Sequence, residues 1–266
     1  MSAILLNTLR GHRWPMLVTA LLIAGFGIII AISFDEAQLE FLSERMPRGV
    51  EALLQAEGNL LLASGVQGYL AIGFRHPLFL IVLSAFAIST ASGALAREIE
   101  QRTILMVLAR PLHRYQVVLG KGIESFMLLA LLVVAMLGGT FIGVAISGLS
   151  DSVSAGPMFL IALNALFLAL AVMGYSYLFS ALSSDGGRAT LLSTGVTLIF
   201  FLMDFIAGLF DVMEPLGPAS IFHYYDPLSI AVDSSFPFLD AGVLLATAVI
   251  TFVVALMVFQ RRDIAA

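Results

Sequence analysis

Three observations predict an all-α polytopic membrane protein with six transmembrane helices. Sixty per cent of the 266 residues are hydrophobic and only 12% are charged, whereas about a quarter of the residues in soluble proteins are charged. The mean hydropathy is +1.02. Apolar runs long enough to cross about 30 Å of hydrocarbon recur along the whole chain. We therefore expect one transmembrane permease domain over residues 1–266, without a separate soluble domain.

Long, predominantly apolar runs define the expected spans. They cover residues 14–34, 76–96, 120–149, 157–183, 188–210 and 239–260. With both termini in the cytoplasm, only Arg45, Arg48 and Arg75 of the 13 basic residues lie outside. This distribution satisfies the positive-inside rule. We therefore expect a multi-pass protein of the cell (inner or plasma) membrane.

Residues 2–13 predict an amphipathic helix lying on the inner leaflet. Its apolar residues are Ile4, Leu5, Leu6 and Leu9, and its polar ones are Asn7, Arg10 and Arg13. Trp14 and Pro15 then turn the chain into the first span.

Two segments are expected on the outer side. Within residues 35–75, the charge-free stretch Gly58–Phe74 could be a seventh span, but a seventh span would move Arg261 and Arg262 outside. Its four glycines better suit an interfacial or re-entrant piece. Residues 213–238 contain four prolines and predict a second outer, re-entrant segment of short helices, with aromatic side chains at headgroup depth.

Residues 97–121 form a charged segment between two apolar runs, so this segment must lie in water. Glu98 and Arg102 are spaced for pairing on one helical face, and Pro111 is expected to stop that helix. Composition alone leaves two interpretations open, an ordinary polar loop and a docking surface.

The order of residues within this segment resembles the cytoplasmic signature of ABC-2 type permeases, the membrane subunits of one class of ABC exporters. The similar stretches are Glu-Ile-Glu-Gln-Arg-Thr at residues 98–103, Leu-Ala-Arg-Pro-Leu-His-Arg at 108–114 and Leu-Gly-Lys at 119–121. The ending Phe-Gln-Arg-Arg-Asp-Ile at 259–264 also looks like the end of such permeases. The family often has Gly before the Thr, where this chain has Arg102.

The resemblance implies a dimer of permeases, each docking a separate cytosolic ABC ATPase subunit through a coupling helix after the second span. By this resemblance the ATPase-coupling residues are Glu98, Glu100, Arg102, Thr103 and Arg110. The chain contains no nucleotide-binding P-loop motif, so ATP and Mg are expected in the partner subunit and no catalytic residue in this chain. The other expected partners are a second permease copy and membrane lipid, and no nucleic acid.

Two polar residues inside the spans are candidates for the translocation path or the dimer seam. Asp204 lies in the fifth span, where an acid needs protein or water around it; alternatively, the span ends early and Asp204 reaches the outer surface. Asn164 in the fourth span favours a hydrogen bond to a neighbouring helix over substrate binding. Gly139 and Gly143 in the third span predict close helix packing.

A metal site is not expected. The four histidines are scattered without ligand spacing, cysteine is absent, and the eleven methionines are spread singly as ordinary apolar residues.

The sequence therefore favours the permease subunit of an ATP-driven ABC exporter that moves or extracts a substrate. The alternative is a non-transporting membrane scaffold or maturation subunit that recruits a cytosolic ATPase. An ion-coupled secondary carrier would need more intramembrane ionisable residues than Asp204.

Overall fold

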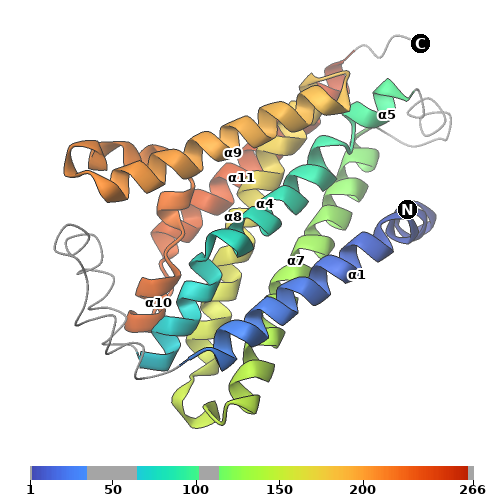
Figure 1. Cartoon of the computed structure of the whole chain (residues 1–266). Coiled ribbons are helices and arrows are strands. Elements are labelled where there is room, and N and C mark those ends of the chain that lie inside the picture. Colours follow the sequence, from blue (N-terminus) through green and yellow to red (C-terminus); the bar gives the residue numbers. More distant parts are fainter. Residues whose placement is uncertain (1, 35–64, 102–113, 263–266) are drawn as a thin grey trace.

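The computed structural model describes residues 2–34, 65–101 and 114–262 (Figure 1). Within them the chain is helical, and six helices are long and apolar enough to span a membrane. This confirms the predicted all-α, six-span fold. The longer helices are α1 (Ser2–Ile32), α4 (Pro77–Ser92), α7 (Arg114–Ile146), α8 (Ala155–Leu182), α9 (Gly186–Leu209) and α11 (Phe238–Arg261). The shorter ones are residues 65–75, α5 (Ala96–Glu100), η1 (Ser150–Ser152), η2 (Asp211–Ala219), η3 (Phe222–Tyr224) and α10 (Pro227–Asp233).

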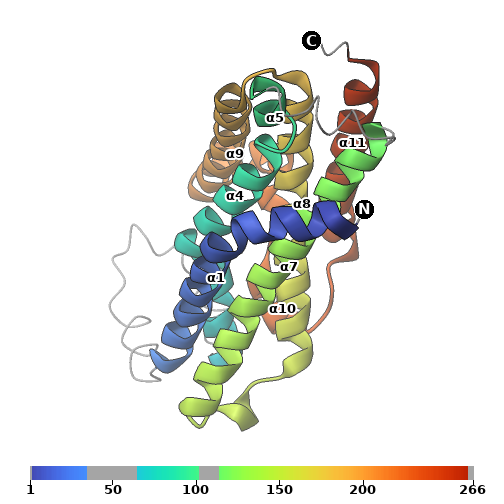
Figure 2. The ribbon, with the colours of Figure 1, turned by 90° about the vertical axis from the view of Figure 1, so that its right-hand side faces the viewer.

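The predicted N-terminal helix and first span form one helix, α1, with Pro15 inside it. Figure 2 shows the first part of α1 lying across the bundle and the remainder running along α7. Proline lacks an N–H and crowds the preceding turn, so a bend is expected near it. The predicted N-terminal helix is therefore continuous with the first span, and the predicted change of direction lies between them.

The long pairing of α1 with α7 depends on glycines. A Cβ atom on Gly139 would lie 2.1 Å from the main-chain oxygen of Ala24, and one on Gly143 would lie 2.6 Å from Cβ of Ala31. A Cβ atom on Gly27 of α1 would likewise lie 2.7 Å from the Met136 carbonyl oxygen of α7. The close helix packing predicted from Gly139 and Gly143 is confirmed.

Helix α8 forms the centre of the bundle and contacts α4, α7, α9 and α11. Of the most apolar 18-residue stretch of each helix, 67% is buried inside the protein in α8 and 11% in α9. Figure 1 shows α9 diverging from α4 and α8 toward η2. Because α9 leaves most of its apolar side chains uncovered, its outer face must lie against lipid or another protein.

The third span begins earlier than predicted, because α7 starts at Arg114 and not at residue 120. Two ionic side chains in the first half of α7 have protein around them: Glu124 is buried and Lys121 is half-buried.

The described parts of both expected outer segments pack into the protein. In residues 65–75, Leu70 and Phe74 are fully buried, and the Gln67 side chain donates to the Ala231 carbonyl of α10 at 3.1 Å. Residues 35–64 lie outside the described ranges. The short helices predicted for residues 213–238 are present as η2, η3 and α10. Phe222 and Tyr225 are buried inside the protein, and their placement at headgroup depth stays a prediction.

Candidate functional site

Two clusters of polar side chains lie toward opposite ends of the bundle. The first, here called the α5 end, comprises α5, the start of α7, the end of α8, the start of α9 and the end of α11. The second, here called the loop end, comprises residue 75, the last turns of α9, and η2, η3 and α10. Helix α9 connects the two, and its 24 residues extend about 36 Å at 1.5 Å per residue.

At the α5 end, Glu98 makes an ion pair with Lys121 of α7. Lys121 Nζ lies 2.6 Å from Glu98 Oε1, and the two side chains are 13% and 24% exposed. This partial burial excludes much of the water that would screen the pair. The pair fastens α5 to the first turns of α7. The Glu98–Arg102 pair expected from spacing cannot be placed, since Arg102 lies outside the described residues.

Glu100 contacts the start of α9. Its Oε2 accepts a hydrogen bond from the Gly186 N–H at 3.0 Å, and Asp185 Oδ1 accepts one from the Arg188 N–H at 2.9 Å. Two carboxylates thus accept hydrogen bonds from N–H groups in the first turn of α9, where the helix dipole favours negative charge. Both predicted coupling acids, Glu98 and Glu100, therefore contact helices of their own chain.

The end of α11 is fastened to α8 by Arg262. Its Nη1 donates to the carbonyls of Ala181 and Ser183, both at 2.7 Å, and its Nη2 contacts Ser184 Oγ. Arg114 of α7 in turn donates to the Arg262 carbonyl at 2.6 Å. This role of Arg262 was not predicted from the sequence, although its place directly after the last apolar run was a usable signal.

A pocket of about 240 Å³ lies between α4, α5, α7 and α8. Its lining includes the basic residues Arg97 and Lys121 and the acids Glu98 and Glu124. Glu124 is 7% exposed and was not among the predicted site residues, because its position one turn inside a span gives no sign of what faces it. The pocket carries balanced charge and suits polar or zwitterionic groups better than a single ion.

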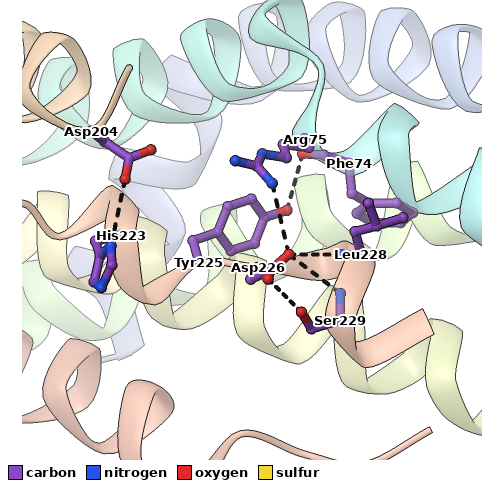
Figure 3. Close-up of polar contacts among 8 residues, drawn as sticks. All are labelled: Phe74, Arg75, Asp204, His223, Tyr225, Asp226, Leu228 and Ser229. Atoms are coloured by element: carbon purple, nitrogen blue, oxygen red, sulfur yellow. Dashed lines mark hydrogen bonds and ion pairs between the residues drawn. The ribbon is translucent and has the colours of Figure 1, made fainter. Parts of the chain in front are cut away.

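At the loop end, Asp204 of α9 points toward His223 of η3, with 4.0 Å between Oδ1 and Nδ1 (Figure 3). Helix α9 continues to Leu209, so the helix does not end before Asp204. Asp204 and His223 line a pocket of about 260 Å³ together with Glu214 and Arg75. Asp204 thus shares a pocket with charged and polar groups of its own chain.

A second polar contact adjoins this pocket (Figure 3). Tyr225 donates its hydroxyl to the Phe74 carbonyl at 3.0 Å, and Arg75 lies 3.8 Å from Asp226, which caps α10. Burial raises the pKa of Tyr225 above its usual value, and Arg75 lowers it by a smaller amount. Tyr225 therefore stays neutral and acts as a hydrogen-bond donor. No sequence signal singled it out from other loop aromatics.

Asn164 lies in the middle of α8 and is fully buried. Neither atom of its amide has a hydrogen-bond partner among the residues that the structure describes. The expected hydrogen bond to a neighbouring helix is therefore not found among the described residues. Its burial within the chain also separates it from the pocket that contains Asp204.

The remaining predicted coupling residues, Arg102, Thr103 and Arg110, lie outside the described residues. Over the described ranges, no group of three or more histidines, aspartates or glutamates is arranged to hold a metal ion.

The comparison with protein families agrees with this architecture. The model of the ABC-2 family transporter protein matches residues 7–264. This chain belongs to that family. The match covers all six spans as well as α5, so the protein is a membrane permease subunit of an ABC transporter. No curated protein matched the chain.

Proposed function

We propose that this permease works as a dimer in the cell membrane and exports or extracts a substrate, driven by a separate cytosolic ABC ATPase that docks at the α5 end. The observation that carries this proposal is the way α5 is joined to the spans. Within five residues, it is fastened to α7 by Glu98 and to α9 by Glu100. A force applied to this short helix is therefore passed to two spans.

The contacts refine the role proposed for the two acids. An acid that already pairs with Lys121 or with the start of α9 offers fewer free acceptors to a partner protein. We therefore assign Glu98 and Glu100 to transmission of movement into the bundle, while the ATPase contacts the exposed surface around them, which includes Arg97 and Gln101. ATP and Mg bind in the partner and not in this chain.

The dimer seam is assigned to the uncovered face of α9. Exposed apolar side chains follow this helix from one end to the other: Leu191, Leu198, Ile199, Leu202, Phe205 and Ile206. Asp204 lies among the last of them and faces the pocket at the loop end. A second copy packed on this face would place two such pockets near the seam, as part of the translocation path.

The function is tested with inside-out membrane vesicles that contain the permease and the ABC ATPase that co-purifies with it. A fluorescent amphipathic dye, a labelled peptide and a fluorescent phospholipid serve as probes. ATP-dependent accumulation of a probe in these vesicles supports export. Bound, ATP-hydrolysing partner without movement of any probe would instead favour the alternative, a scaffold or maturation subunit.

The transmission role is tested by reversing the charges of the Glu98–Lys121 pair. Glu98→Lys alone places two like charges at a contact of 2.6 Å, so we expect about a tenfold loss of permease-stimulated ATP hydrolysis. Combining Glu98→Lys with Lys121→Glu restores opposite charges and is expected to recover most of the activity. Full activity in the single variant, or no recovery in the double variant, would contradict the role of this pair.

A further inference from the structure

We infer that Ser180 of α8 is a positioning residue that sets the orientation of α5 and links it to α8 and α9. Its consequence for transport rests on the proposed docking of the ATPase at the α5 end. Its structural part depends only on this chain and can be tested without a partner.

The Ser180 hydroxyl is inserted into the main-chain hydrogen bonds between α4 and α5. In a continuous helix the Ala96 N–H would donate to the Ser92 carbonyl, four residues earlier. Here the Ala96 N–H donates to Ser180 Oγ at 3.0 Å, and Ser180 Oγ donates to the Ser92 carbonyl at 2.7 Å. Insertion of a side chain into this ladder is an established cause of a helix break.

The same hydroxyl also accepts the Leu95 N–H at 3.1 Å. A serine hydroxyl has one hydrogen to donate and two lone pairs to accept, so the three contacts use its full capacity. Ser92 and Ser180 are both fully buried, which keeps bulk water from replacing these bonds. Without the hydroxyl, either the buried N–H groups lose their acceptor or Ala96 bonds directly to Ser92. Either result changes the orientation of α5.

The Ser92 side chain extends the connection to α9. Its Oγ lies 2.8 Å from Thr190 Oγ1, and Thr190 already donates its hydroxyl hydrogen to the Gly186 carbonyl at 2.9 Å. Ser92 is therefore the donor in this pair. Glu100 accepts the Gly186 N–H. The first turn of α9 therefore contacts Ser92, before the break, and Glu100, after it. A shift of α5 is passed through this contact to α9.

The orientation of α5 can be measured by disulfide formation between Arg97→Cys and Gly186→Cys. A Cβ atom on Gly186 lies 3.3 Å from Cβ of Arg97, near the mean of about 3.8 Å in disulfides. The chain has no cysteine of its own, so only this pair forms. In membranes under a mild oxidant, adding Ser180→Ala is expected to slow cross-linking by about fivefold or more.

Ser176→Ala is the matched control. Ser176 lies one turn earlier on α8 and is equally buried, but its hydroxyl donates only to the Val172 carbonyl of its own helix. We expect the two cysteines to cross-link at the same rate with Ser176→Ala as without it. Equal rates in Ser180→Ala and Ser176→Ala would overturn the inference.

A second arm measures the ratio of transport to ATP hydrolysis in the complex. Ser180→Ala is expected to lower this ratio by about threefold or more with the ATPase still bound. An unchanged ratio with slowed cross-linking would overturn the role in coupling and leave docking, measured by co-purification, intact. If Ser180→Ala does not fold, Thr190→Val removes only the hydroxyl that faces Ser92. We expect slower cross-linking in that variant as well, and an unchanged rate would overturn the link to α9.

Discussion

An acidic side chain in an apolar helix is tolerated when other groups replace the water that it loses. Asp204 meets this condition because residues far from it in the chain, His223 and Arg75, line the same pocket. Asn164 does not meet it within the described residues, although it is the more deeply buried of the two. Removing the polar group is therefore expected to change function at Asp204 and stability at Asn164.

For Asp204→Asn we expect a functional effect with little change in stability. Asp204 and His223 are 27% and 47% exposed and 4.0 Å apart, and ion pairs this accessible contribute at most about 1 kcal/mol. If the carboxylate lies on the translocation path, removing its charge is expected to lower substrate-stimulated ATP hydrolysis by about threefold or more. Reconstituted wild type and variant are compared at equal protein. Indistinguishable hydrolysis with every probe would remove Asp204 from the path.

Asn164→Leu is expected to stabilise the protein. The substitution keeps roughly the same side-chain volume and removes an amide that has no partner, which costs about 1–3 kcal/mol when buried. The thermal unfolding midpoint of the purified protein in detergent is expected to rise, while Asn164→Ala, which leaves a cavity, lowers it. A lower midpoint for Asn164→Leu would mean that the amide has a partner beyond the described residues, such as a bound water.

At the scale of helices, the α1–α7 pair depends on backbone contact more than on side-chain interdigitation. Gly139 faces α1, where a methyl group would meet the Ala24 backbone at 2.1 Å. Its neighbour Gly138 has nothing within 4 Å of the same position. Replacing each of these two glycines by alanine therefore makes the same chemical change at a position in the helix contact and at an open position.

Gly139→Ala is expected to destabilise the protein by about 1–3 kcal/mol, since α1 and α7 must separate to admit the methyl group. Gly138→Ala is expected to be neutral or to stabilise by up to about 1 kcal/mol, because alanine favours the helix over glycine. Thermal unfolding of both variants under one condition measures the difference. Equal midpoints would show that α1 does not approach α7 this closely.

At the scale of the whole molecule, the six spans place α5 and the α7–α8 connection on opposite sides of the membrane. The chain lacks cysteine, so single cysteines can report this topology. A cysteine at the exposed Gln101 is expected to be unreactive toward an impermeant thiol reagent in intact cells, and one at the exposed Ser152 is expected to react. Reaction at Gln101 alone would invert the proposed orientation.

Much of the fold was predictable because crossing a membrane is a local property of the sequence. Each span is specified by a run of apolar residues, whose free energy of transfer adds along the helix. That Gly139 and Gly143 form a close helix contact was also predictable, since two glycines four residues apart lie on one helical face, but that α1 is the partner was not. The family followed from residues 98–121 and from the chain as a whole.

The sequence by itself therefore determined the number of spans, the family and the segment expected to couple to the ATPase. Only the tertiary structure decided which polar groups meet: Glu98 with Lys121, Glu100 with Gly186, and Ser180 with the break before α5. The physical reason is that polar contacts depend on direction, whereas hydrophobic transfer does not. Hydrophobic transfer depends on composition and needs no partner, whereas a hydrogen bond or ion pair needs two groups at a fixed distance and angle. Helix packing alone sets that geometry for residues 23 to 88 positions apart.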